Sequence, residues 1–126
     1  MLIHGASGGV GTMAVQIAKA RGARVIATAS ARNLDYLRSL GADQVIDYEA
    51  TRFEDVAKDI DVVLDAVGKD TLDRSWQVLK KGGILVSIVG NPSQEKAKSF
   101  GVRAVSVGAG PDTAQLVEAW FPLKQG

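Results

Sequence analysis

The sequence predicts an α/β fold: a single domain built on a doubly wound, six-stranded parallel sheet in the order 3-2-1-4-5-6. Two observations support this prediction. Short apolar runs alternate with amphipathic stretches along the chain of 126 residues, which is typical of parallel strands connected by helices. The connections are short, and the first of them is a turn of small residues, as in doubly wound sheets.

The composition is that of an ordinary globular domain. The chain is 46% hydrophobic and 23% charged, with a net charge of +1 and no cysteine. The small net charge gives no reason to expect a nucleic-acid or membrane partner, and no apolar run approaches the roughly 20 residues of a membrane span. Without cysteine, these residues form no disulfide and no cysteine-ligated zinc site. Together with a start that lacks the layout of a signal peptide, this predicts a cytoplasmic location.

Apolar spacing and glycines mark the first three elements. The run from Met1 to His4 predicts a strand, and a turn of small residues follows it. Gly22 is placed to end the next helix in the left-handed conformation, and the run from Arg24 to Ala29 predicts the second strand. The apolar face of that helix is formed by residues at helical spacing: Val10, Met13, Ala14, Ile17 and Ala18.

Two further helices are predicted around the third strand. Asn33 is placed to cap a short helix that ends at Gly41, and Gln44 to Tyr48 forms the strand. Residues Thr51 to Glu54 have the spacing of a capping box, which predicts the start of a third helix. The apolar side chains of that helix would be Phe53, Val56 and Ala57.

The second half of the chain supplies the other strands. The apolar run from Asp61 to Val67 predicts a central strand buried on both faces. A helix with an apolar face at Leu72, Trp76 and Leu79 then leads through a turn at residues 80–83 into the fifth strand, Ile84 to Val89.

The chain is predicted to end with a helix, a strand and another helix. A polar helix over residues 94–99 precedes the sixth strand, Val102 to Val107. The last helix is expected to be capped by Asp112 and stopped by Pro122.

The turn after the first strand has the spacing of a dinucleotide-binding motif. Ala6, Gly8 and Gly11 occupy the three places of G-x-G-x-x-G. The middle glycine of such a motif lets backbone N–H groups approach a pyrophosphate, and the last lets the helix pack close to its strand. The positive end of the helix dipole faces the phosphates. The sequence therefore predicts a Rossmann fold with its ligand at the carboxyl ends of strands one and four.

Two other motifs also fit this turn, but the sequence lacks the further residues that each of them requires. Residues 5–9 also read G-x-S-x-G, the nucleophile elbow of α/β-hydrolases, but that fold needs a histidine after its serine. The only histidine, His4, precedes Ser7. A G-x-x-x-G-x-G reading resembles the short-chain dehydrogenases, whose Tyr-x-x-x-Lys pair is absent because neither Tyr36 nor Tyr48 is followed by a lysine four residues later.

The end of the second strand favours NADP(H) over NAD(H). A domain that binds NAD normally places an acidic residue there to hold the ribose hydroxyls. This chain has Ser30 and Arg32 instead, and its nearest acid is Asp35. A serine hydroxyl and a guanidinium would hold a 2′-phosphate that a carboxylate would repel.

These stretches resemble the medium-chain dehydrogenase/reductases, in particular the zinc-independent quinone oxidoreductases of the zeta-crystallin type and the related alkenal reductases. The similarity lies in residues 4–11, in residues 39–48 with their Leu-Gly-Ala-Asp turn, and in the Asp-Ala-Val-Gly sequence at 65–68. It covers nearly all of the chain.

The resemblance implies a set of cofactor-binding residues, and it implies no catalytic or metal-binding residue. The glycine turn would hold the pyrophosphate, the 2′-phosphate would lie among three side chains from the second and third strands, and the ends of strands four and five would border the nicotinamide and its ribose. The residues are, in that order, Ser7, Gly8, Gly9 and Val10; Ser30, Arg32 and Tyr48; and Val67, Gly68, Val89 and Gly90. Some members carry a lysine just after the second strand, where this chain has Asn33 and Leu34, so Arg32 would supply the charge alone.

The resemblance further implies an enzyme that passes hydride from NADPH to a quinone or an activated double bond. The chain corresponds to the cofactor domain (1–126), so the small-molecule substrate would bind mainly to a catalytic domain outside it. The family joins two cofactor domains through the sixth strand, which predicts a homodimer across Val102 to Val107. Two alternatives stay open: the cofactor domain of a zinc-dependent alcohol dehydrogenase, and a non-catalytic module that senses NADP(H).

Overall fold

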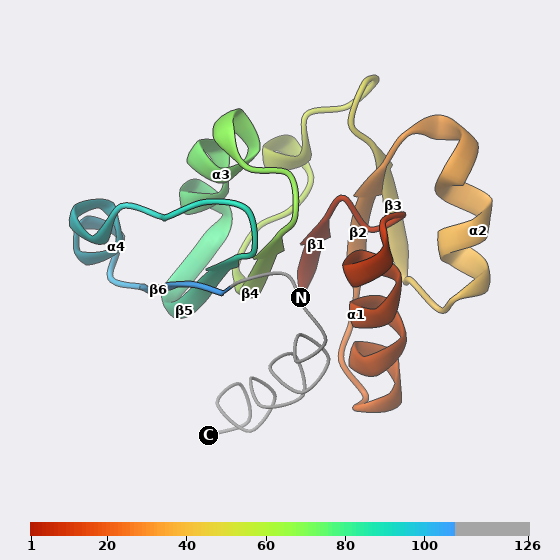
Figure 1. Cartoon of the computed structure of the whole chain (residues 1–126), viewed down its shortest axis with the longest axis horizontal. Helices are drawn as coiled ribbons and strands as arrows, with labels where there is room; N and C mark the ends of the chain where they lie inside the picture. Colours follow the sequence, from red (N-terminus) through yellow and green to blue (C-terminus); the bar gives the residue numbers. More distant parts are fainter. Residues whose placement is uncertain (108–126) are drawn as a thin grey trace.

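The computed structural model describes residues 1–107 (Figure 1). Six strands form one sheet in the order β3-β2-β1-β4-β5-β6, and every neighbouring pair is parallel. This confirms the predicted fold class and strand order. The strands are β1 (Leu2–His4), β2 (Ile26–Ala29), β3 (Gln44–Asp47), β4 (Ile60–Asp65), β5 (Leu79–Ser87) and β6 (Arg103–Ser106).

Helices lie on both faces of the sheet. Figure 1 shows α1 and α2 beside the half that holds β2 and β3, and α3 and α4 beside the half that holds β4 to β6. The α-helices are α1 (Gly9–Ala20), α2 (Leu34–Ser39), α3 (Lys69–Ser75) and α4 (Gln94–Phe100). Three 3-10 turns complete the connections: η1 (Ala31–Asn33), η2 (Phe53–Asp55) and η3 (Trp76–Val78). The helix expected between Asp112 and Pro122 lies outside the described residues.

Two hydrophobic clusters separate along the strands, because successive side chains point to opposite faces. Ile3 and Leu64 pack with α1 and α2 in one cluster. Leu2 and Val63 belong to the other cluster, with η2, η3 and α4. All four side chains are fully buried, as expected for central strands that are covered on both faces.

The first crossover follows the sequence closely. Helix α1 buries Ala14, Val15 and Ala18 against the sheet. Gly22 follows its last turn with φ +80° and donates its N–H to the carbonyl of Lys19 at 3.0 Å. This confirms the left-handed glycine predicted at the end of the helix.

Two predicted caps are wrong. The helix expected from Thr51 is only the single turn η2, and the carboxylate of Glu54 accepts from Arg52 and from Arg74, which lies 20 residues further along the chain. This distant partner replaces the capping box. Asn33 ends η1 and does not cap α2 with its side chain, which hydrogen-bonds to the hydroxyl of Ser30 instead.

Strand β5 begins five residues earlier than predicted. Leu79, expected on a helix face, already pairs with Ile60, and the ladder shifts register before Val62 pairs with Ile84. Residues 80–83, expected as a turn, therefore form an irregular segment within β5. A Cβ on Gly83 would lie 2.8 Å from the carbonyl oxygen of Asp61, so the close approach requires glycine.

Among residues 1–107, the structure contains no helix long and apolar enough to cross a membrane.

Candidate nucleotide site

The predicted phosphate turn connects β1 to α1. Gly5 follows β1 with φ +70°, and its carbonyl accepts the N–H of Gly8 at 3.1 Å. Helix α1 then begins at Gly9, with no side-chain cap and no acidic residue in its first turn. The first amides of a helix have no partner within it. The turn thus presents N–H groups and the positive end of the helix dipole without a competing carboxylate, which suits an anion.

The glycines of this turn differ in the space around them. A Cβ on Gly9 would meet no atom within 4 Å, and one on Gly8 would come no closer than 3.5 Å to the carbonyl oxygen of Gly5. On Gly11 it would lie 2.5 Å from that same oxygen and 2.5 Å from the Cα of Ala6. Gly11 is therefore required for packing α1 against β1, whereas Gly8 and Gly9 leave an open surface that a phosphate can approach.

A pocket of about 270 Å³ lies beside the turn, at the carboxyl ends of β1, β2 and β4. It brings together four of the predicted cofactor-binding residues from four separate segments. Its lining residues are Gly5, Ser7, Thr28, Ala29, Ser30, Tyr48 and Val67. Tyr48 is 59% exposed, and its backbone N–H bonds to the carbonyl of Ala29, which holds the residue at the rim.

Ser30 and Arg32 both follow β2, and Ser30 lines this pocket. The side-chain amide of Asn33 donates to the Ser30 hydroxyl at 3.1 Å. Arg32 lies on η1, outside the pocket lining, and is exposed. Its guanidinium forms no hydrogen bond or ion pair with residues 1–107. The structure thus places a hydroxyl and an unengaged cation at the end of β2, where NAD-binding domains have a carboxylate.

The loops after β4 and β5 hold the other predicted residues, and a buried polar pair fixes both loops. Asp65 is fully buried and accepts the N–H groups of Val67 and Gly68 at 2.9–3.1 Å. Ser87 donates to Asp65 at 3.1 Å and accepts the N–H groups of the next loop. Those last N–H groups belong to Val89 and Gly90.

These two loops lie close to one another and to the turn. A Cβ on Gly5 would lie 3.1 Å from Val67, and a Cβ on Gly68 would lie 3.1 Å from Val89. The ends of β1, β4 and β5 therefore form a continuous row. Asp65 satisfies backbone donors, as expected for a buried carboxylate. Sequence analysis missed the role of Ser87, for which a hydroxyl inside an apolar strand was the only signal.

His4, at the end of β1, is packed in the interior of the protein. It is 1% exposed, and its ring meets Phe53 edge to face with the ring centroids 4.3 Å apart. Its ring nitrogens lie 3.1 Å from the hydroxyls of Thr28 and Ser75. Burial, assisted by the positive charge of Arg74, lowers the pKa of His4 from 6.5 to about 3, so the imidazole is neutral in ordinary buffers.

A partly buried ion pair, between Arg74 and the buried Glu54, lies next to His4. The guanidinium of Arg74 contacts both carboxylate oxygens of Glu54 at 2.5 and 2.6 Å and stands over the ring of Phe53. Hydrogen bonding from Arg74 lowers the pKa of Glu54 from 4.5 to about 2, and the pair raises the pKa of Arg74. This ion pair links η2 to α3. Neither group has a pKa near neutrality, so neither is suited to act as an acid or base there.

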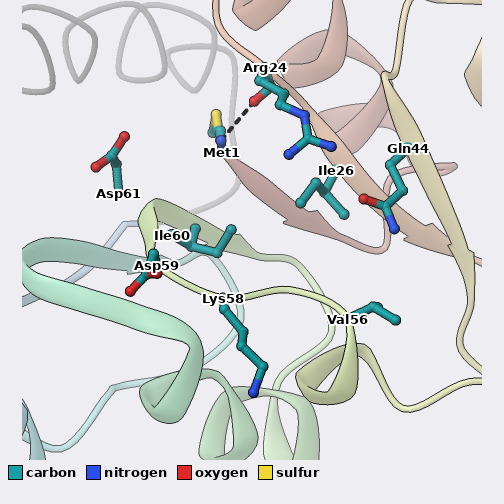
Figure 2. Close-up of a pocket in the computed structure, with 9 residues that line it drawn as sticks. All are labelled: Met1, Arg24, Ile26, Gln44, Val56, Lys58, Asp59, Ile60 and Asp61. Carbon is teal, nitrogen blue, oxygen red and sulfur yellow. Dashed lines mark hydrogen bonds between the residues drawn. The ribbon is translucent and has the colours of Figure 1, made fainter.

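A second hollow, of about 300 Å³, lies at the opposite ends of the strands from the glycine turn (Figure 2). It is formed where the strands begin, by residues that include Arg24, Gln44, Asp59 and Ile60. Figure 2 shows the Lys58 side chain pointing away from Arg24. Ligands of doubly wound sheets bind at the carboxyl ends of the strands, so the smaller pocket beside the glycine turn is the candidate site.

Comparison with known proteins identifies the family. Residues 9–108, which are 100 of the 126 residues, match the family described as zinc-binding dehydrogenase. The chain belongs to this family. The match confirms the resemblance to the medium-chain dehydrogenase/reductases.

Individual members of the family share both sequence and fold with this chain. An NADPH-dependent alkenal/one oxidoreductase of Arabidopsis thaliana chloroplasts is 44% identical over 92 residues, which are 71% of this chain and 23% of that protein. The quinone oxidoreductase of Coxiella burnetii superposes with a TM-score of 0.79 at 35% identity, over 94% of this chain and 39% of the other.

A third relative was solved with a cofactor. The Escherichia coli quinone oxidoreductase complexed with NADPH gives a TM-score of 0.75 at 30% identity, covering 98% of this chain and 43% of the other. The chain thus spans less than half the length of each of these three dehydrogenase relatives.

The family name mentions zinc, but the part of this family member that the structure describes offers no ligand set for it. No group of three or more histidine, cysteine, aspartate or glutamate side chains within residues 1–107 could hold a metal ion.

Proposed function

We propose that this chain is the NADP(H)-binding domain of a reductase that passes hydride to a quinone or to the activated double bond of an enal or enone. One observation carries the cofactor part of the proposal: an uncapped glycine turn opens beside a pocket whose β2 rim has a hydroxyl and an unengaged arginine in place of an acid. The Arabidopsis, Coxiella and Escherichia coli relatives support the choice of substrate class.

The residues of the site fit a dinucleotide in three sections. The first amides of α1 would hold the pyrophosphate, where Ser7, Gly8, Gly9 and Val10 leave an open surface. Ser30 and Arg32 would hold the 2′-phosphate, with Tyr48 covering the adenosine at the rim. Charge-assisted hydrogen bonds from a guanidinium to phosphate are stronger than neutral ones, so Arg32 would dominate the preference for NADP(H).

The nicotinamide end would lie against the row formed by the loops after β4 and β5. Bound NADPH supplies the hydride itself, from its nicotinamide ring. Val67, Gly68, Val89 and Gly90 would set the position of that ring. The backbone of the two loops is fixed by Asp65 and Ser87, so the domain would orient the cofactor rather than move a proton.

We further propose that residues 1–126 act as one cofactor domain within a longer protein whose remaining part binds the small-molecule substrate. The shares of the relatives that the chain covers, 23% to 43%, support this division. A cytoplasmic location stays part of the proposal. The Arabidopsis relative is chloroplastic, so fractionation of the native cell is the direct test, and recovery in an organelle would overturn it.

Two measurements test the proposed function. In ¹H–¹⁵N NMR spectra of the chain, NADPH should shift the amides of Gly8 to Val10, Ser30, Tyr48 and Val67 while leaving Lys58 unmoved. Shifts confined to the pocket around Lys58 would contradict the site. The full-length protein should then oxidise NADPH with a quinone or an enal. Activity only on alcohols, and only with added zinc, would favour a zinc alcohol dehydrogenase, and binding without any turnover would favour an NADP(H) sensor.

We also propose that two copies join through β6. This strand ends the sheet, and its Val105 is 36% exposed. No strand within residues 1–107 pairs with the outer side of β6. A sheet edge of this kind is a template for pairing, and pairing across a two-fold axis would be self-complementary. The interface would extend over Val102 to Val107.

The direction of the backbone decides which substitution tests the dimer. Val107 donates its N–H to Ser87 on β5, and N–H groups alternate in direction along a strand. The N–H of Val105 therefore also faces β5, whereas that of Ser106 faces outward. Ser106→Pro should yield monomers in light scattering, and Ser106→Ala should stay dimeric because it keeps the N–H. A monomeric unmutated chain, or a dimer that survives Ser106→Pro, would refute the interface.

A further inference from the structure

A buried chain of hydrogen bonds links the candidate cofactor pocket to α3. It runs from Thr28, which lines the pocket, through the ring of His4 to Ser75 at the end of α3. Thr28 is 4% exposed, and His4 and Ser75 are exposed by 1% or less. Groups this deeply buried form their hydrogen bonds with one another rather than with bulk water. The position of each proton therefore follows from the partners that are present.

Counting protons fixes the state of the imidazole. The hydroxyl of Ser75 has one proton, and it donates that proton to the carbonyl of Thr71 at 2.7 Å. The Ser75 oxygen can therefore only accept from His4, so the proton of the ring resides on Nε2. The ring is buried and neutral, which leaves Nδ1 as an acceptor.

The same count fixes the hydroxyl of Thr28. Because Nδ1 of His4 carries no proton, the contact of 3.1 Å must be a donation from Thr28 Oγ1 to His4. The only hydroxyl proton of Thr28 is then committed to the interior. The hydroxyl oxygen of Thr28 then has only lone pairs left to offer a ligand. Thr28 can therefore accept a hydrogen bond from a group in the pocket but cannot donate one.

This sets Thr28 apart from its neighbours in the pocket. The hydroxyls of Ser7 and Tyr48 are exposed and can rotate to donate or to accept. The guanidinium of Arg32, on η1 outside the pocket lining, can only donate. A bound nucleotide with phosphates supplies acceptors to such groups, and a fixed acceptor at Thr28 requires a donor on the nucleotide.

We propose that His4 is a positioning residue that makes Thr28 a fixed hydrogen-bond acceptor, and that Thr28 thereby selects a nucleotide by a donor group on its adenosine part. The donor is a ribose hydroxyl or the exocyclic amine of adenine. The proposal rests on the proposed function to the extent that the pocket binds an adenine nucleotide.

The protonation state can be tested without any ligand. His4 is the only histidine in the chain, so the ¹⁵N NMR spectrum of its ring is assigned without ambiguity. We expect an unprotonated, pyridine-like Nδ1 and a protonated Nε2 at pH 7. The opposite tautomer, or a charged ring, would overturn the inference while leaving the proposed function untouched.

The selection is tested with adenosine 5′-monophosphate and three analogues: the 2′-deoxy and 3′-deoxy forms and purine riboside 5′-monophosphate, which lacks the amine. NMR titrations compare the unmutated chain with Thr28→Val, which removes the hydroxyl, and with Thr28→Ser, which keeps it. Loss of one neutral hydrogen bond should weaken adenosine monophosphate about three- to tenfold in Thr28→Val. Thr28→Ser should restore most of this affinity.

The analogue that lacks the relevant donor should bind the unmutated chain and Thr28→Val equally. If Thr28→Val weakens all four nucleotides by the same factor, Thr28 acts only through structure and the proposal is wrong; unchanged affinities would refute it equally. An insensitive 2′-deoxy analogue would support the selection but contradict NADP(H), whose 2′ position carries the phosphate. No binding of any nucleotide would refute the proposed function and the selection together.

Discussion

Adding one methyl group at two neighbouring glycines should separate the folding role of the turn from its binding role. Both Gly9 and Gly11 lie in the first turn of α1. An alanine at position 9 would place its Cβ in open space, whereas at position 11 the Cβ would lie 2.5 Å from the carbonyl oxygen of Gly5 and from the Cα of Ala6. Real Cβ contacts almost never fall below 3.0 Å, so Gly11→Ala must push α1 away from β1.

The two substitutions should therefore change the free energy of unfolding in opposite directions. Replacing a glycine at a compatible position by alanine stabilises a protein by about 0.4–1 kcal/mol, so Gly9→Ala should raise the melting temperature slightly. Overpacking typically costs about 1–3 kcal/mol. With backbone atoms on the other side of the contact, we expect Gly11→Ala to reach the upper part of that range, or roughly 10 °C or more in melting temperature for a domain of this size.

Binding should follow a different order. The methyl of Gly9→Ala would occupy the surface where we expect the pyrophosphate, so this variant should lose most NADPH affinity while gaining stability. Thermal unfolding by circular dichroism and isothermal titration with NADPH measure the two effects on the same samples. If Gly9→Ala binds NADPH like the unmutated chain, the pyrophosphate does not lie on the turn; if Gly11→Ala keeps full stability, the packing argument is wrong.

Three further predictions follow from other parts of the site. Arg32→Ala should weaken NADPH binding roughly tenfold or more and leave NADH binding nearly unchanged, since a charge-assisted contact is worth about 1.5–3 kcal/mol; equal losses for both cofactors would show that Arg32 does not contact the 2′-phosphate. Because the pKa of His4 is about 3 in the folded state and near 6.5 when unfolded, its contribution to stability is complete above pH 6.5 and declines as the pH falls. Urea titrations between pH 6.5 and 5 should show a slope approaching about 1.4 kcal/mol per pH unit, with Glu54 adding its own loss below pH 4.5 as the pH falls toward its folded value of about 2; constant stability from pH 7 to 5 would contradict the buried neutral ring. Asp65→Asn places an amide donor against backbone N–H groups and should lower the free energy of unfolding by about 1–3 kcal/mol. It should also weaken NADPH binding, because the loop after β4 loses its hydrogen bonds to Asp65; unchanged NADPH affinity would show that the loop does not depend on them.

Local sequence signals predicted the sheet because its determinants are local. Apolar runs, the spacing of the glycine turn and the glycine after α1 each act within a few residues. Two of the errors arose where a distant partner decided the local structure. Glu54 pairs with Arg74 rather than capping its own turn, and Leu79 joins β5 because Ile60 offers it a place in the ladder. No pattern within ten residues indicates either contact.

The candidate site divides in the same way. The glycine turn and the serine–arginine pair after β2 could be recognised from residue type and spacing. The roles of Thr28 and Ser87 could not be recognised, because each depends on a hydrogen bond between strands: Thr28 with His4 on β1 and Ser87 with Asp65 on β4. A sequence does not reveal which way a hydroxyl proton points, and the structure settles it only through the chain of partners that ends at Thr71.

The preference for NADPH over NADH tests the central claim most directly. Titration of the unmutated chain with each cofactor, at low and at high salt, compares ligands that differ only in the 2′-phosphate. We expect NADPH to bind at least tenfold more tightly at low salt, and we expect the difference to shrink as salt screens the exposed guanidinium of Arg32. Equal affinities, or a preference for NADH, would contradict the assignment of this domain to NADP(H).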